Sequence, residues 1–128
     1  DLRGPSRVES FPWVSLHEKG HEGLEEIITA PVKTIMFNLG YLPSGDKAIT
    51  TGPETTLTAI KAGSRILAPG GLMTITVYTG HEGGVAESEA VTEYVRSLAQ
   101  EDFAVASYQF LNQRNSPPHL IAVEKRVR

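Results

Sequence analysis

The chain has 128 residues, 40% of them hydrophobic, which predicts one domain with a real core rather than two. It contains no cysteine, and this excludes a disulfide framework, a thiolate metal site and a cysteine nucleophile. The formal net charge of −3 argues against binding nucleic acid by bulk electrostatics, although a local basic patch could still serve.

The amino-terminal segment is predicted to contain only short elements. Residues 1–10 have no period and look like a linker or a cut end, and the apolar run around Trp13 predicts a short strand. Two histidines and two glutamates occur within residues 17–22, but their spacing matches no metal-ligand motif, so we expect no metal. Residues 24–28 predict one to two helical turns, which Pro31 keeps from running into the next strand.

The stretch from Val32 to Lys47 is where we place the chemistry. Its first residues are β-branched or bulky with little charge, which predicts a strand covered on both faces in a mainly parallel sheet. The run stops at Asn38 and opens into a loop rich in glycine and proline. Ligands of open α/β sheets bind outside the carboxyl ends of the strands, so Asn38, Tyr41 and Asp46 lie at a candidate site. The alternative is a strand followed by an ordinary turn.

A helix and a second strand follow this loop. The sequence Thr51-Gly52-Pro53-Glu54 matches a capping box, and it predicts a helix that ends at Ala68-Pro69-Gly70-Gly71. Residues 72–79 are rich in β-branched side chains and predict a strand. The order strand, helix, strand predicts a right-handed parallel βαβ unit, so the loop at residues 80–84 should emerge at the same edge as Asn38.

The carboxyl-terminal third predicts a helix and a hairpin. Apolar residues at i, i+4 and i+8 mark the helix, and we assign Glu87, Glu89 and Glu93 to its solvated outer side. Residues 103–113 and 120–127 are extended runs separated by a turn, which predicts an antiparallel hairpin. This α/β order is that of the carboxyl half of the class I methyltransferase (Rossmann-like) fold, whose last strand inserts into an otherwise parallel sheet.

Three motifs carry a family resemblance: MFNLGYLPSGDK, VYTGHEGG and YQFLNQRNSPPHLIAVEK. Together they are similar to the YtqB/MnmM family of rRNA methylase-like proteins, and the resemblance extends from about Trp13 to Lys125. It implies an S-adenosylmethionine-dependent enzyme that acts on RNA. The implied reaction is methylation of the 5-aminomethyl nitrogen of a (2-thio)uridine at the tRNA wobble position.

The resemblance also assigns roles to single residues. The segment Asn38-Leu39-Gly40-Tyr41 stands where amino-methyltransferases keep an Asn/Asp-Pro-Pro-Tyr loop, so the Asn38 amide would orient the amine and Tyr41 would border the base. The implied catalytic residues are Asn38, Tyr41, Asp46 and His81, the last two as candidate bases. The implied cofactor contacts are Gly20, His21, Asn38 and Leu39. The implied substrate contacts are Gly40, Tyr41, Pro43, Lys47, Tyr78, Arg114 and Asn115.

Simpler interpretations stay open for several of these residues. Asp46 follows Gly45 and also suits a plain turn, and His81 also suits a structural role within its loop. Lys47, Arg114 and Asn115 also suit an ordinary polar surface.

One departure from the family pattern concerns the cofactor. Class I methyltransferases bind it with a glycine-rich turn after the first strand and an acidic residue after the second, and this chain has neither. We therefore expect residues 1–128 to form one methyltransferase-like domain without the amino-terminal cofactor-binding part. The alternative is a shortened, non-catalytic module that binds RNA or a partner subunit.

The remaining expectations concern location and partners. No apolar run approaches the roughly 20 residues that a bilayer-spanning helix needs, so we expect a cytoplasmic protein without a membrane partner. The expected partners are a tRNA substrate and a second copy of the chain in a homodimer.

Overall fold

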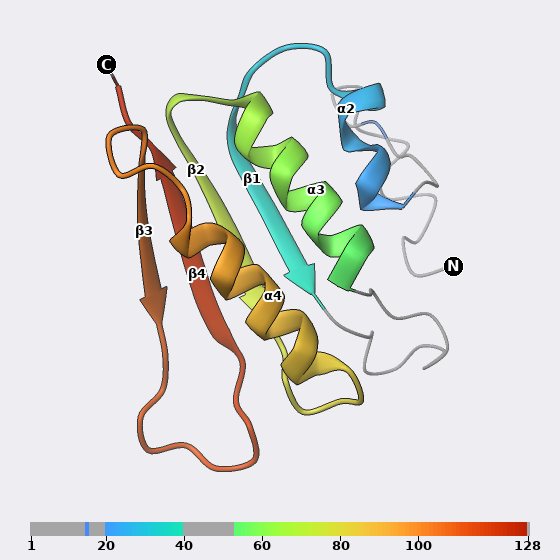
Figure 1. Ribbon diagram of the computed structural model, residues 1–128, viewed down its shortest axis with the longest axis vertical. Helices are drawn as coiled ribbons and strands as arrows, with labels where there is room; N and C mark the ends of the chain where they lie inside the picture. Colours follow the sequence, from blue (N-terminus) through green and yellow to red (C-terminus); the bar gives the residue numbers. More distant parts are fainter. Residues whose placement is uncertain (1–14, 16–19, 40–52, 128) are drawn as a thin grey trace.

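The computed structural model describes residues 15, 20–39 and 53–127. In this part, four strands form one sheet in the order β1-β2-β4-β3. The helices α2, α3 and α4 lie on one side of the sheet, and the loop that links β3 to β4 extends beyond it (Figure 1). The elements in chain order are the 3-10 turn η1 (His21–Gly23), α2 (Leu24–Ile27), β1 (Val32–Leu39), α3 (Pro53–Ile66), β2 (Leu67–Val77), α4 (Gly84–Arg96), β3 (Phe103–Tyr108) and β4 (His119–Lys125).

The strand order confirms the predicted topology. Strands β1 and β2 are parallel and are joined by α3, as the strand–helix–strand pattern predicted. Strand β4 lies between β2 and β3 and is antiparallel to both, which is the inserted last strand of the class I methyltransferase fold. Because two of the three pairings among the described strands are antiparallel, this part of the sheet is mixed rather than mainly parallel.

The hydrophobic core lies between the sheet and the helices α3 and α4. On β1, Phe37 and Leu39 are buried while Asn38 between them is exposed, as expected for a strand whose side chains alternate between two faces. Each fully buried aliphatic side chain contributes about 1.5–3 kcal/mol relative to an exposed one. The other core residues are Leu67, Met73, Ile75, Val77, Ile121 and Val123 from the sheet and Ala59, Ile60, Val91 and Val95 from the helices.

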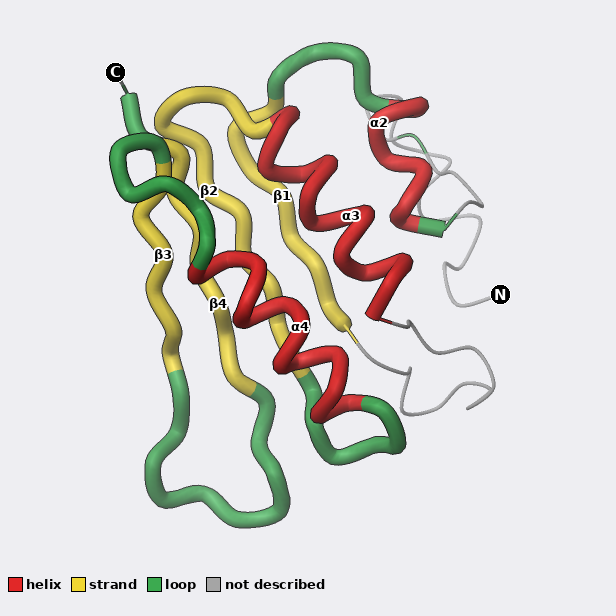
Figure 2. The backbone as a smooth tube through the Cα atoms, viewed as in Figure 1, coloured by secondary structure: helices red, strands yellow, loops and turns green. Residues whose placement is uncertain are grey.

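The opposite side of the sheet, which we call the open face, is not covered by any described element (Figure 2). Met36 on β1 is 73% exposed and Tyr108 on β3 is 67% exposed. The prediction that β1 is covered on both faces is therefore wrong for the described part of the chain. Apolar composition alone does not distinguish a strand that is buried on both faces from a strand that is buried on one face only. In β1 the side chains of Thr34, Met36 and Asn38 point away from the core.

The segment Ala68–Gly71, which was predicted to end the helix before a strand at residues 72–79, lies within a strand. Strand β2 includes it, and Val32 pairs with Leu67 while Thr34 pairs with Leu72. The four residues of this segment therefore form a bulge, because only Lys33 lies opposite them on β1. Gly70 in this bulge has a φ of +82°, which favours glycine. The predicted strand at Trp13 and the predicted helix cap at Thr51 and Gly52 lie outside the described residues.

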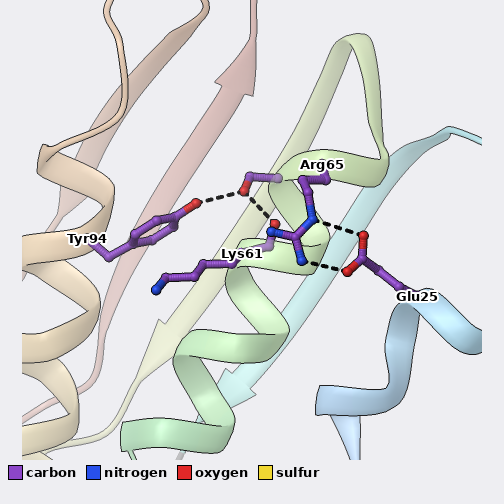
Figure 3. Close-up of polar contacts among 5 residues, drawn as sticks. Glu25, Lys61, Arg65 and Tyr94 are labelled. Atoms are coloured by element: carbon purple, nitrogen blue, oxygen red, sulfur yellow. Dashed lines mark hydrogen bonds and ion pairs between the residues drawn. The ribbon is translucent and has the colours of Figure 1, made fainter.

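Polar contacts join the three helices of this layer (Figure 3). The Ser64 hydroxyl donates to the carbonyl of Lys61 at 2.8 Å, so the Tyr94 hydroxyl donates to Ser64 at 2.9 Å and links α4 to α3. Arg65 donates to Glu25 with 3.0 Å between Nε and Oε2, and this hydrogen bond lowers the pKa of Glu25. The pair is exposed, so it stabilises the fold little. None of the described helices combines the length and apolar character that crossing a bilayer requires.

Candidate active site at the carboxyl edge of the sheet

Three chain segments meet at one edge of the sheet. The carboxyl ends of β1 and β2 point to the same edge because the two strands are parallel. The loop between β3 and β4 lies at this edge as well (Figure 1), since Val77 at the end of β2 pairs with His119 at the start of β4. A Cβ atom on Gly80 would lie 3.9 Å from Cβ of Ser116, so the loop after β2 is next to the hairpin loop. This edge is the candidate active site.

Asn38 presents an exposed side chain at this edge. It is the penultimate residue of β1 and pairs with Thr76 on β2, while its neighbours Phe37 and Leu39 point into the core. The two buried neighbours fix the strand, and strand alternation then places the Asn38 carboxamide on the open face. A carboxamide oxygen accepts hydrogen bonds from an amine, which is the role that the family resemblance implies for it.

The loop after β2 holds two further predicted residues. Tyr78 follows β2 directly and is 37% exposed on the same face as Asn38. The carbonyl of His81 accepts a 3.0 Å hydrogen bond from the amide of Gly84, at the start of α4. A Cβ on Gly84 would lie 2.8 Å from the carbonyl oxygen of Tyr78 and 3.1 Å from Cε1 of His81. Glycine at this position therefore lets α4 begin directly against the loop that carries both residues.

The predicted cofactor contacts other than Asn38 are His21, Leu39 and Gly20. His21 stacks its ring edge-to-face on Phe37 with 5.8 Å between centroids, and its Nε2 is buried without a hydrogen-bond partner among the described residues. Phe37 is the residue before Asn38 on β1, and its side chain points to the opposite face. His21 therefore lies close to Asn38 along the strand but on the helical side of the sheet. Leu39 is only 1% exposed, so its side chain belongs to the core and its backbone alone remains for a ligand. Gly20 precedes η1 in an extended conformation.

The hairpin loop carries the last described site predictions. Arg114 and Asn115 are both exposed, and Asn115 has a φ of +66°. Their position beside the loop after β2 suits contacts with the phosphates or sugars of a nucleic acid. The other predicted site residues lie outside the described part of the chain: Gly40, Tyr41, Pro43, Asp46 and Lys47.

Glu87 corrects one sequence prediction. Glu89 and Glu93 are exposed as expected, but Glu87 is 1% exposed and accepts a 2.7 Å hydrogen bond from the hydroxyl of Thr56. Its second oxygen, Oε1, is buried and has no hydrogen-bond partner within the described ranges. The helical spacing contains the missed signal, because Glu87 precedes the buried Val91 by four residues and therefore shares its face.

The Thr56–Glu87 pair lies behind the candidate site. Thr56 is in the first turn of α3, the next described element after β1, and Glu87 is in the first turn of α4, which follows the loop after β2. The hydrogen bond between them therefore ties together the two helix starts that leave the site. A buried carboxyl group needs such partners, since an unsatisfied one costs about 1–3 kcal/mol.

A groove elsewhere on the molecule has no predicted site residue in its lining. It lies between α4 and β3 on the helical side, has a volume of about 380 Å³, and is lined by Val95, Leu98, Phe103, Val105, His119 and Ile121, among others. Burial lowers the pKa of His119 there. Because Asn38 and Tyr78 face the other side of the sheet, the groove is separate from the candidate site.

A family model described as "Putative rRNA methylase" matches residues 6–124, nearly the whole chain. The chain belongs to this rRNA methylase family. One relative is the "tRNA (mnm(5)s(2)U34)-methyltransferase, chloroplastic" of Arabidopsis thaliana, which is 44% identical over 106 residues. That match covers 81% of this chain and 39% of the plant protein.

Solved structures agree with membership of the rRNA methylase family. The "putative rRNA-methylase" of Clostridium thermocellum superposes with a TM-score of 0.88 and 41% identity, covering 94% of this chain and 64% of that one. A "putative methyltransferase" of Streptococcus mutans in complex with SAH gives a TM-score of 0.84 and 39% identity, covering 97% and 69%. The chain thus spans about two fifths of the plant relative and about two thirds of these structures.

Proposed function

We propose that the protein carrying this chain is an S-adenosylmethionine-dependent methyltransferase that acts on RNA. Its proposed substrate is the 5-aminomethyl group of a (2-thio)uridine at the wobble position of tRNA. The observation that carries this proposal is the exposed Asn38 carboxamide at the carboxyl end of β1, on the same edge of the sheet as Tyr78 and the hairpin loop. The name of the 44% identical plant relative supports the choice of substrate.

The described residues fit the edge of a cofactor site. Asn38 and the backbone of Leu39 would border the cofactor on β1, and the orphaned Nε2 of His21 offers one polar contact beside Phe37. S-adenosylmethionine supplies an electrophilic methyl group when it is bound. The support for this cofactor is the SAH-bound Streptococcus mutans structure, which shares 39% identity with this chain.

The chemistry that this chain supplies is orientation of the amine. The carboxamide oxygen of Asn38 accepts one N–H of the aminomethyl group, which turns the nitrogen lone pair towards the donor. The amine must be neutral to react, so a group at the edge has to take its proton, and His81 is the described candidate for this role. The proposed compartment is the cytoplasm, whereas the plant relative is chloroplastic.

Replacement of Asn38 tests the proposal. In the full protein, we expect Asn38→Ala to lower the rate of methyl transfer to tRNA by about a hundredfold or more, because the amine loses its orienting acceptor. The affinity of the variant for the product S-adenosylhomocysteine should stay within several-fold of that of the unaltered protein. Mass spectrometry of nucleosides from the reacted tRNA measures the first quantity, and calorimetry measures the second.

The matched control is Thr34→Ala, which alters an exposed side chain on the same face of β1 but further from the edge. It should leave both quantities unchanged. Turnover by Asn38→Ala close to that of the unaltered protein would remove the central assignment. An unaltered protein that binds tRNA but transfers no methyl group would favour the alternative of a non-catalytic RNA-binding module.

A further inference from the structure

The tip of the β3–β4 hairpin, residues 108–116, exposes large apolar side chains to solvent. Leu111 is 98% exposed, Tyr108 is 67% exposed and Phe110 is 51% exposed. Figure 1 shows this loop extending past the rest of the sheet, so no described helix covers it. Adjacent apolar side chains that a fold leaves in water mark an interaction surface more often than a stabilising element.

We propose that this hairpin tip binds the unpaired nucleotides next to the target nucleotide of the RNA substrate, with bases stacked on Phe110 and Tyr108. The proposal rests on the proposed function, since it assigns the partner surface of the same site. Tyr108, Phe110 and Leu111 are not among the site residues predicted from the sequence.

The position of the tip is the first argument. Asn38 pairs with Thr76, Thr76 with Leu120 and Leu120 with Tyr108, so these four residues form one row across the open face. Three strand spacings separate the ends of this row, which corresponds to about 14 Å. The tip also adjoins the loop after β2, where Gly80 approaches Ser116. A nucleotide held at Asn38 would therefore have its neighbours within reach of the tip.

The shape of the tip is the second argument. The rings of Tyr108 and Phe110 meet edge-to-face with 6.1 Å between centroids and 79° between planes, which holds one ring relative to the other. Asn115 and Ser116 have positive φ values of 66° and 51°, and prolines occupy the next two positions. The two prolines fix φ at their positions, which reduces the conformational freedom that binding would otherwise have to remove.

The chemistry of the tip is the third argument. Residues 103–123 contain no aspartate or glutamate, although the chain has 15 acidic residues. The tip instead adds Arg114 and the amide side chains of Gln109, Asn112, Gln113 and Asn115 to its aromatic rings. Aromatic rings that stack on bases, together with a cation for the phosphates, are the means by which proteins bind single-stranded nucleic acid. The surface therefore suits unpaired RNA better than an apolar protein partner.

The test measures RNA binding by fluorescence anisotropy with the full protein. The probes are an RNA stem-loop with an unpaired loop and a blunt RNA duplex of the same composition. We expect Phe110→Ala to weaken binding of the stem-loop about tenfold and to leave binding of the duplex unchanged, because only unpaired bases can stack on the ring. Phe110→Tyr should retain stem-loop binding, because it keeps the ring.

The control is Val127→Ala, which alters a side chain that is 77% exposed and lies just beyond the end of β4, away from the candidate site. It should bind both probes like the unaltered protein. Tyr108 is 67% exposed and supplies the second stacking ring, so Tyr108→Ala provides a second variant that should also lose stem-loop affinity.

Three results decide the outcome. Stem-loop affinity unchanged in both Phe110→Ala and Tyr108→Ala would overturn the proposal. If the variants bind the stem-loop normally but have a smaller sedimentation coefficient than the unaltered protein, the tip would instead be an interface between copies of the chain. Weakened stem-loop binding in a protein that transfers no methyl group would support the tip as an RNA surface while refuting the proposed function.

Discussion

At the scale of single residues, the buried pair of Thr56 and Glu87 shows how the site is supported from behind. Both side chains are almost inaccessible, and the hydroxyl of Thr56 is the described donor to the carboxyl group. The pair joins the first turns of α3 and α4 rather than facing the open side of the sheet. Its contribution should therefore appear in folding stability and in the spacing of the two loops.

For this pair we predict strongly coupled effects on stability. Thr56→Val keeps the shape of the side chain but removes the hydroxyl, so the buried carboxyl group loses its donor and unfolding should become easier by about 2 kcal/mol. Adding Glu87→Met removes the unsatisfied group, and the double variant should return to within about 1 kcal/mol of the unaltered protein. Urea denaturation measures the free energy of unfolding.

The control for this cycle is Thr58→Val, which removes an exposed hydroxyl that donates to the carbonyl of Glu54 on the same helix. Its effect should stay below about 0.5 kcal/mol. Additive effects of Thr56→Val and Glu87→Met would show that the hydrogen bond does not couple the two helices.

At the scale of elements, the packing of α3 on the sheet depends on Gly63. A Cβ at this position would lie 2.9 Å from Sδ of Met73 and 3.4 Å from Cε2 of Phe37. Glycine within a helix costs about 1 kcal/mol relative to alanine, so its presence here reflects the close approach of the helix to the strands.

We predict different effects for two substitutions of Gly63. Gly63→Ala should change the free energy of unfolding by less than about 1 kcal/mol, because the gain in helix propensity offsets a small shift of Met73. Gly63→Val should destabilise the protein by about 2–3 kcal/mol, since a branched side chain overpacks the contact. Thermal unfolding measures both, with Thr58→Val again as the exposed helix control. Equal stability of the valine variant would mean that the helix moves away from the sheet without cost.

At the scale of the whole molecule, the described sheet has one edge at β1 and one uncovered face with exposed apolar side chains. Strand β1 is at one edge of the strand order, and the open face carries Met36 and Leu72 with exposed fractions of 73% and 41%. An apolar edge strand without a charged residue at its centre is a site where further chains can pair. Both features lie on the side of the molecule that carries Asn38.

For the 128-residue chain we therefore predict self-association through β1 and the open face. Its weight-average mass in sedimentation equilibrium should rise with protein concentration, and Met36→Lys should lower this mass because an added charge opposes apolar contact at the edge. Val127→Lys adds the same charge beyond the end of β4 and should leave the association unchanged. A single monomeric species at all concentrations would contradict this prediction.

Several features of this protein follow from the sequence by itself. The alternation of strand and helix patterns predicted the parallel pair β1 and β2 around α3, and the paired extended runs predicted the antiparallel hairpin. Local patterns suffice for these elements because turn residues and hydrophobic periods act over a few positions. The motif around Asn38 likewise predicted a side chain at the carboxyl end of a strand, and the structure places it there.

Other features were decided only by the tertiary structure. Glu87 looked like part of an acidic outer face, but the position of α4 against α3 turned it inward onto Thr56. The exposure of Met36 and the row from Asn38 to Tyr108 depend on which strands become neighbours and in which register. Residues that are far apart in the chain acquire these relations through packing, and a local sequence pattern carries no information about the partner that packing supplies.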